Sequence, residues 1–311
     1  MIGGENNFMR KAGKLERTNS WDALASSIFP NRIFQPSSLP HKIFYIFLGV
    51  ACLLWLPARA ANERDLWTLW TLAEKTPDDH DRVIAACRAF AAANAQDELL
   101  PVARGIEAWR LLKTGRTNDA VAVMTPYLAD SEQPVAAGAQ ILSRAWFSRL
   151  DRPVVEAALK EYYRAEIRYP DNLAQLTAHP RVAAKPLPPV VDRWNAAWRY
   201  SAAGYEGVPG FIGQKYLLQS YRLGDTSDLS AALAIPYASR VQFTLLPAGE
   251  AATGAARARV ETTAADGGKT VTILESGRLL DPLYFAYISP NLVIACDRLH
   301  WRVVQTPKPR P

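Results

Sequence analysis

The stretch that decides the fold is VVEAALKEYYRAEIRYP, residues 154–170. Its apolar residues recur at steps of three and four, which predicts an amphipathic helix over residues 154–167. One face would bury an apolar stripe, while Glu156 and Lys160 on another side have the favourable four-residue spacing. The helix is expected to end before Pro170, because the residue before a proline avoids the α region. The stripe consists of Val155, Ala158, Leu159, Tyr162 and Ala165.

The residues after this helix are rich first in proline and then in aromatic side chains. Four prolines between residues 180 and 189 predict an ordered but irregular loop. We expect Trp194, Trp198 and Tyr200 to lie at the entry to a strand and to cover the apolar face of the helix. An aromatic platform that binds a ligand is the alternative, although aromatic side chains more often pack in cores.

This order of residues resembles the globular head of the pseudopilins of type II secretion and of type IV pilins. In that family an amphipathic helix ends at a Tyr-Pro, an Asp-Pro-Trp-Gly-like segment leads into a strand, and a Tyr-x-Leu-Gly segment closes the sheet. The resemblance covers residues 154–237, about a quarter of the chain, and implies a small α+β unit in a cell-envelope protein. The matching residues are Tyr162, Tyr169, Pro170, Asp192, Trp194, Asn195, Trp198, Tyr200, Tyr221, Leu223 and Gly224.

Two features depart from that family. A pilin carries its hydrophobic segment, with a Gly-Phe-x-x-x-Glu processing motif, directly before this helix, whereas about a hundred residues intervene here. We therefore do not expect the chain to polymerise as a pilus subunit. Where a major pseudopilin has a glycine-rich calcium loop, this chain has Asp225 and Asp228. Calcium binding is one interpretation, and the one we favour is a solvated turn in which Asp228 caps a short helix over residues 229–233.

Helical periodicity extends through the preceding residues 62–152. Apolar stripes predict helices near residues 65–74, 83–91, 99–113, 118–128 and 134–150, joined by short turns. Gly115 follows the third helix as a left-handed cap would. The small residues Ala108 and Ala120 flank this turn, which resembles one unit of a tetratricopeptide repeat. Such arrays commonly bind peptides or partner proteins, and a plain helical spacer is the alternative.

From about residue 239 the apolar period changes to two. Strands are predicted near residues 241–245, 258–262, 271–273, 284–288, 292–295 and 301–304, and Asp266-Gly267 is typical of a tight turn. These short strands indicate a small antiparallel sandwich or barrel. The sequence therefore predicts an α+β protein with a tail and signal peptide or anchor (1–61), a helical array (62–152), a pilin-like unit (153–238) and a small all-β domain (239–311).

The N-terminal region contains the uncharged apolar run IFYIFLGVACLLWL, residues 43–56. This run is shorter than the roughly 20 residues that cross a bilayer, and Ala58-Arg59-Ala60 supplies the small residues that a signal peptidase recognises. We therefore expect an exported, periplasmic protein. An uncleaved inner-membrane anchor is the alternative, with membrane contact limited to residues 43–57. The polar residues 1–40 are long for a leader, which a downstream start codon or a cytoplasmic tail would explain.

The charge distribution argues against nucleic acid as a partner. The chain has a formal net charge of +6, but residues 1–61 hold seven basic and three acidic residues, which leaves +2 for the rest. A near-neutral folded part lacks the electrostatic footprint that binding to a phosphate backbone requires.

Candidate catalytic groups lie close together only in Cys296, Asp297 and His300. A cysteine nucleophile normally draws its histidine from elsewhere in the fold, so we expect a strand ending at Cys296, followed by a turn. The sequence has no phosphate-binding glycine loop, no paired-histidine metal motif and no Gly-x-Ser-x-Gly elbow. We therefore predict no catalytic residue, metal or cofactor, and expect Cys87 and Cys296 to pack as small apolar side chains.

Two functions fit these patterns. The first is a non-enzymatic exported interaction or scaffold protein, related to type II secretion or type IV pilus systems, that binds other envelope proteins. The second is an envelope ligand-binding protein or hydrolase that uses the C-terminal β domain. The second function requires a pocket that brings Asp297 or His300 together with polar side chains from distant strands.

Overall fold

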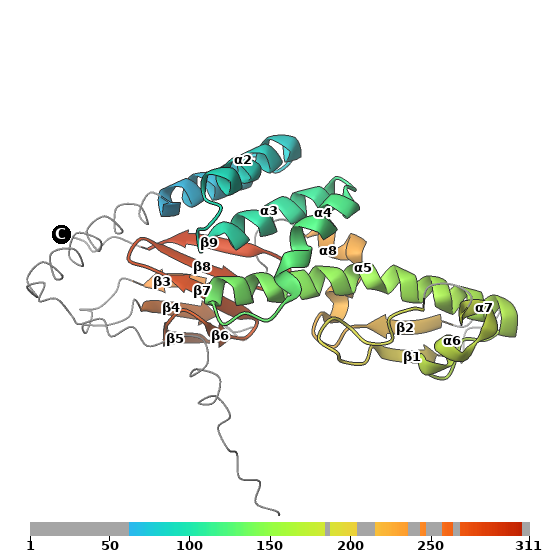
Figure 1. The fold of residues 1–311 in the computed structure, drawn as a ribbon. Helices are drawn as coiled ribbons and strands as arrows, with labels where there is room; N and C mark the ends of the chain where they lie inside the picture. The colour runs from blue at the N-terminus through green and yellow to red at the C-terminus, as the bar shows by residue number, and fades with distance from the viewer. Residues whose placement is uncertain are drawn as a thin grey trace, which may run out of the picture. The chain divides into compact units, whose positions relative to one another are not determined.

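The computed structural model describes residues 62–183, 187–203, 215–235, 243–246, 257–263 and 268–306. All of them belong to one compact unit, Trp55–Pro311. The fold is α+β, as predicted, with helices in the first half of the chain and antiparallel sheets after them (Figure 1). The predicted signal peptide or anchor lies outside the described residues. Among the helices that are described, none has the length and apolar character of a membrane span.

The first half of the described chain is a series of helices. A helix over residues 62–75 is followed by α2 (His80–Ala93), α3 (Leu100–Lys113), α4 (Thr117–Met124) and the 3-10 helix η1 (Thr125–Leu128). Gly115 adopts φ +75°, and Arg116 N–H donates to Leu111 O at 2.8 Å, so α3 ends in the left-handed cap that the sequence predicted. Ala108 and Ala120 are both fully buried, because short side chains allow α3 and α4 to approach closely.

The fifth helix, α5 (Pro134–Glu166), is continuous where the sequence predicted two helices. Pro153 lies inside it, although an internal proline costs a helix about 3 kcal/mol. Tertiary contacts on both sides outweigh this cost, because Arg149 and Val155 are both fully buried. The boundary expected between residues 152 and 153 therefore falls inside a single helix.

The C-terminal half of α5 has a small core of its own. Strands β1 (Arg199–Ala203) and β2 (Lys215–Gln219) form an antiparallel pair. Four residues of the α5 stripe are buried together with Trp198, which precedes β1, and Leu218 of β2; they are Val155, Ala158, Leu159 and Tyr162. Ala165 is only half-buried, and Trp194, which we expected to cover the helix, is not part of this core because its side chain reaches the surface. Two short helices, α6 (Ala174–Ala178) and α7 (Pro180–Ala183), occupy part of the segment that we expected to be irregular, and Leu176 and Val182 complete the core.

The C-terminal region contains two antiparallel sheets, each with its strands in chain order. The first consists of β3 (Phe243–Leu246), β4 (Ala258–Thr263) and β5 (Lys269–Leu274). The second consists of β6 (Arg278–Leu280), β7 (Leu283–Ile288), β8 (Leu292–Cys296) and β9 (Trp301–Gln305). Apolar residues of both sheets share one core cluster. The sequence did not predict β6, which has only three residues and an exposed Leu279.

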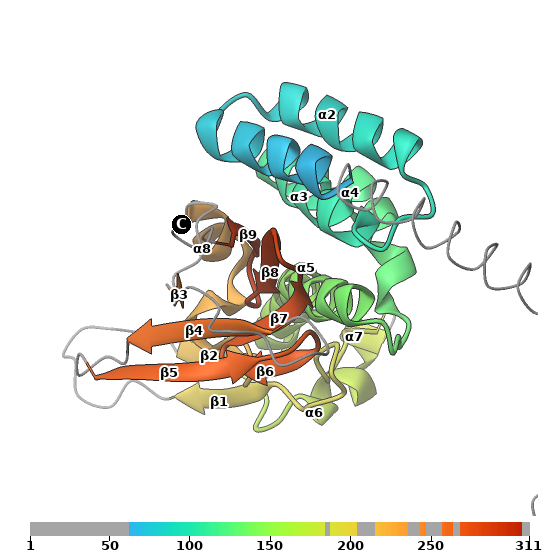
Figure 2. The ribbon, with the colours of Figure 1, turned by 90° about the vertical axis from the view of Figure 1, so that its left-hand side faces the viewer.

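The four-stranded sheet is buried on both faces. Along β8, Val293 and Ala295 belong to the core shared with the first sheet, whereas Leu292, Ile294 and Cys296 belong to the helical core. Figure 2 shows β8 and β9 on the side of the sheets that is nearer to α3 and α5. Because both faces pack, β8 is an unbroken apolar run. The C-terminal β segment thus shares its core with the helices.

Trp301 of β9 joins the sheet to two helices through their glycines. A Cβ atom added to Gly105 of α3 would lie 2.3 Å from Nε1 of Trp301, and one added to Gly138 of α5 would lie 2.6 Å from its Cη2. These distances are far inside van der Waals contact, so only glycine admits the indole at either position. Glycine inside a helix costs roughly 0.5–1 kcal/mol relative to alanine, and here the packing of the ring compensates for that cost.

We predict that Gly138→Ala lowers the free energy of unfolding by about 1–3 kcal/mol, because the new methyl group collides with Trp301. Urea unfolding of the purified protein measures the effect. In a Trp301→Leu background the same change is expected to be neutral or stabilising, because the smaller side chain leaves room and alanine favours the helix. An equal loss in both backgrounds would show that the indole is not the cause.

Candidate functional site

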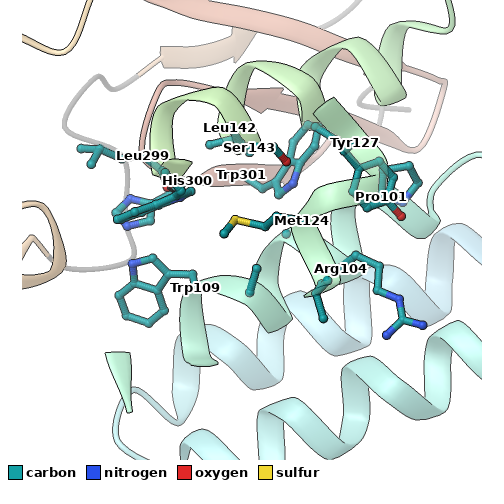
Figure 3. Close-up of a pocket in the computed structure, with 15 residues that line it drawn as sticks. Pro101, Arg104, Trp109, Met124, Tyr127, Leu142, Ser143, Leu299, His300 and Trp301 are labelled. Atoms are coloured by element: carbon teal, nitrogen blue, oxygen red, sulfur yellow. Dashed lines mark hydrogen bonds between the residues drawn. The ribbon is translucent and has the colours of Figure 1, made fainter. Parts of the chain in front are cut away.

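A small pocket lies where α3, η1 and α5 meet the turn before β9 (Figure 3). Its wall is mainly apolar and aromatic. Figure 3 shows the ring of His300 facing Trp109 on one side of the pocket, with Tyr127 and Arg104 on the other. The lining includes Trp109, Met124, Tyr127, Trp146, His300 and Trp301.

His300 is held in this wall as a neutral ring. Its side chain is buried, and Trp109 meets it edge to face with 5.5 Å between ring centroids. Burial lowers the pKa of His300 to about 4, with Arg149 adding to the decrease and Asp297 opposing it. The imidazole therefore carries no charge at neutral pH.

Asp297 shapes the turn between β8 and β9. Its Oδ1 accepts the backbone N–H groups of Leu299 at 2.6 Å and of His300 at 2.7 Å. Trp146 of α5 donates its Nε1–H to the carbonyl of Leu299 at 3.2 Å. The strand and turn that the sequence predicted are confirmed, and the carboxylate of Asp297 stabilises the backbone of that turn.

Arg149 links α5 to two loops from the interior of the protein. Its Nε–H donates to Thr226 O at 2.8 Å in the 3-10 helix η2 (Gly224–Ser227), and its Nη1–H donates to Arg298 O at 2.9 Å. Burial lowers the pKa of Arg149 to about 9, while Asp297 opposes this shift. Carbonyl acceptors and the face of Trp146, 4.5 Å away, compensate for the buried charge.

The remaining chemistry of the pocket region is limited by burial and by volume. The Cys296 thiol is fully buried, which raises its pKa well above the usual range, and its Sγ lies 3.6 Å from Gly138 O. Cys87 is also buried. Neither of these two cysteines forms a disulfide, and both pack in the core as predicted. The volume that the centre of a water molecule can occupy in the cavity is about 20 Å³, so the cavity holds roughly one water. Among the described residues, none accepts the Nε1–H of Trp301.

The residues that match the pilin pattern lie in another part of the structure, where Asp192 joins two turns. Asp192 is buried, and its Oδ1 accepts the N–H groups of Trp194 at 2.9 Å and Ala196 at 3.1 Å. Its Oδ2 accepts the hydroxyl of Ser220 at 2.7 Å. Asn195, at φ +60°, provides the left-handed residue of the first turn. One carboxylate thus holds residues 191–197 against residues 220–224.

The other matching residues mostly build the small core beside α5. Trp198 donates its Nε1–H to Pro189 O at 3.0 Å, and Tyr200 donates its hydroxyl to Pro170 O at 2.7 Å. The ring of Tyr169 lies between those of Tyr163 and Tyr216, with centroid distances of 4.8 and 4.9 Å. Tyr162 and Leu223 are buried, and Gly224 has φ +53°. These positions support a structural role for most of the set.

Several side chains of the two turns reach the surface, and we call three of them, Trp194, Tyr221 and Arg222, the aromatic–arginine surface. Tyr221 is 70% exposed, and Trp194 is half-buried. The guanidinium carbon of Arg222 lies 5.6 Å from the centroid of the Trp194 ring. Sequence reasoning missed Arg222, because no pattern indicates that it stacks on an aromatic residue 28 positions away.

Asp228, one of the two acidic residues that could have bound calcium, makes other contacts. Asp228 caps α8 (Leu229–Ala234) by accepting Ala231 N–H at 2.8 Å, as predicted, and its Oδ2 lies 3.4 Å from Nη1 of Arg152. In the described ranges of the chain, no group of three His, Cys, Asp or Glu side chains is arranged to hold a metal ion.

The buried His300 predicts a specific pH dependence of stability. The folded protein keeps His300 neutral down to about pH 4, whereas in the unfolded chain it binds a proton near its ordinary pKa of 6.5. The unfolded state therefore binds more protons in this window, and stability falls as the pH drops from 6.5 to 4. We expect His300→Gln to lose less stability over this range than the wild type, by up to about 3 kcal/mol. Parallel pH profiles for the two proteins would contradict the prediction.

Asp192 predicts a graded mutational series. Asp192→Ala leaves one buried and two part-buried donors without their acceptor, which we expect to cost about 2–4 kcal/mol in urea unfolding. Asp192→Asn keeps one carbonyl oxygen and should cost clearly less. Hydrogen exchange should accelerate at the amides of Trp194 and Ala196 in the alanine variant. Unchanged exchange at these two amides would show that the carboxylate does not hold the turn.

Comparison of the chain with protein-family models, with curated proteins and with solved structures gives no match. We therefore infer the function from the geometry of this chain's own residues.

Proposed function

We propose that this chain is a non-enzymatic exported envelope protein that serves as an interaction or scaffold component related to type II secretion or type IV pilus systems. In this proposal a tetratricopeptide-like array precedes a pilin-like unit, and the mature protein is periplasmic or held at the inner membrane by residues 43–57. Its partners are other envelope proteins.

The observation that carries the proposal is the packing of Trp198 and Leu218 on the stripe of α5. The resemblance to pilin heads implies a long helix whose apolar face is covered by a small antiparallel pair of strands. The matching residues Tyr162 and Trp198 lie in this core, and Tyr200 packs against it.

The helical array has the rigidity that a scaffold requires. Arg110, fully buried in α3, donates to the carbonyls of Ala73 at 2.6 Å and of Pro77. Glu107, one turn earlier, is buried and pairs with Arg88 and Arg104 at 2.7 Å each. These contacts of buried charged groups help to fix the mutual position of the helices, because losing them would leave a charge in the core with fewer partners.

The alternative function, ligand binding or hydrolysis by the C-terminal β segment, has one observation in its favour. A pocket does contain His300, but apart from its chain neighbours Leu299 and Trp301 the side chains around it come from α3, α4, η1 and α5. Its room for about one water is too small for a substrate, and its histidine and the nearby thiol are buried. These features favour the interaction proposal.

Export and partnership can be tested together in the native host. We expect β-lactamase fused after residue 311 to confer ampicillin resistance only when residues 1–61 are present. Formaldehyde cross-linking of the full chain should then recover secretion or pilus components from the envelope fraction, and the chain lacking residues 1–61 is the matched control. Resistance without residues 1–61, or recovery of only ribosomes and nucleic acid, would contradict the proposal.

A further inference from the structure

The two turns joined by Asp192 are held by several further hydrogen bonds. Ser220 N–H donates to Ser227 Oγ at 3.0 Å, and the Ser227 hydroxyl donates to Gly224 O at 2.7 Å. With the bonds to Asp192, these contacts form a buried polar network with several satisfied members. Such a network specifies one loop geometry, since any other arrangement would leave buried polar groups unpaired.

The same turns are also fastened to α5. Arg193 N–H donates to Ser148 Oγ at 3.1 Å, and the Arg193 guanidinium makes a two-point contact with the carboxylate of Asp151, with Nη2 2.7 Å from Oδ1. The aromatic–arginine surface is therefore presented in a fixed position. Fixing a surface before binding removes much of the entropy cost that association otherwise carries.

The residue types on this surface are those that dominate protein interfaces. Trp, Tyr and Arg are the side chains whose truncation most often weakens a complex. Tyr221 is 70% exposed, which is unusual for a large aromatic residue on a turn that is otherwise held so closely. Trp194 contributes one ring face to Arg222 and is itself only half-buried.

The charges around the surface indicate the kind of partner. Arg193 is neutralised by Asp151, and Arg152 by Glu156 and Asp228. Arg222 differs, because within the described ranges no carboxylate pairs with its guanidinium. A guanidinium that stacks on an indole keeps its edge N–H groups for two parallel hydrogen bonds to a carboxylate.

We propose that the aromatic–arginine surface binds an acidic segment of a partner protein, in which an Asp or Glu carboxylate pairs with Arg222 and a neighbouring apolar side chain packs on Trp194 or Tyr221. This inference rests on the proposed interaction function and specifies the partner of that protein. A phosphorylated segment is the alternative partner, and the test below distinguishes the two.

The test uses the full chain and a short fluorescein-labelled peptide of alternating Glu and Leu, with fluorescence anisotropy as the readout. The glutamate peptide should bind at least about tenfold more tightly than the same peptide with Gln at every Glu position, a difference of about 1.4 kcal/mol. Arg222→Gln should remove this difference, and Trp194→Ala should weaken binding of both peptides.

The matched control is Arg181→Gln, which removes the same charge from an exposed position of α7 in the same unit. It should leave binding of the glutamate peptide unchanged. Equal weakening by Arg181→Gln and Arg222→Gln would overturn the inference, because it would indicate diffuse electrostatic attraction. Equal binding of the Glu and Gln peptides, or tighter binding of a phosphoserine peptide, would also overturn it.

A second measurement separates this inference from the proposed function. A photo-cross-linking amino acid at position 221 should form an adduct with an envelope protein in living cells, and the cross-linked partner peptide should contain Asp or Glu. If the glutamate peptide does not bind but an adduct forms through a neutral segment, the inference of an acidic partner is wrong and the proposed interaction function stands. Failure of both measurements contradicts the inference and the function together.

Discussion

The contact on which the rest of the described structure depends is the indole of Trp301 between Gly105 and Gly138. A ring that fits only where two helices lack a Cβ atom fixes α3, α5 and β9 relative to one another. A second link reinforces this geometry, since the carboxylate of Glu63, in the helix over residues 62–75, accepts hydrogen bonds from Tyr287 at 2.6 Å and Asn291 at 2.9 Å. The sheet and the helical array therefore share one core.

The continuity of α5 extends this geometry to the small core that contains β1 and β2. Its N-terminal half contributes Gly138 and Trp146 to the helix–sheet core, and its C-terminal half contributes Leu159 to the second core. Between them, Arg149 contacts both η2 and the turn before β9. One helix thus belongs to both cores, and the turns that carry the aromatic–arginine surface are hydrogen-bonded to its middle. This arrangement suits a protein that presents a fixed surface to a partner.

Periodicity in the sequence predicted most elements but only part of the candidate site. The stripe of α5, the cap at Gly115, the cap at Asp228 and most C-terminal strands follow from local patterns, and the structure contains them. Local rules failed at Pro153, where the sequence predicted a break. Buried contacts of Arg149 and Val155 on either side keep that helix intact, and those of Arg149 are made with residues far away in the chain. The contact of Arg222 with the Trp194 ring could not be predicted from the sequence for the same reason.

The sequence by itself determined the α+β class, the order of the helical array before the C-terminal strands, and caps such as those at Gly115 and Asp228, because these depend on neighbours within a few positions. Only the tertiary structure decided that the C-terminal sheet is covered on both faces, that His300 is neutral and buried, and that Asp192 reaches Ser220. Each of these facts depends on side chains that are distant in the chain. Burial and hydrogen bonding, rather than local spacing, determine how such residues behave.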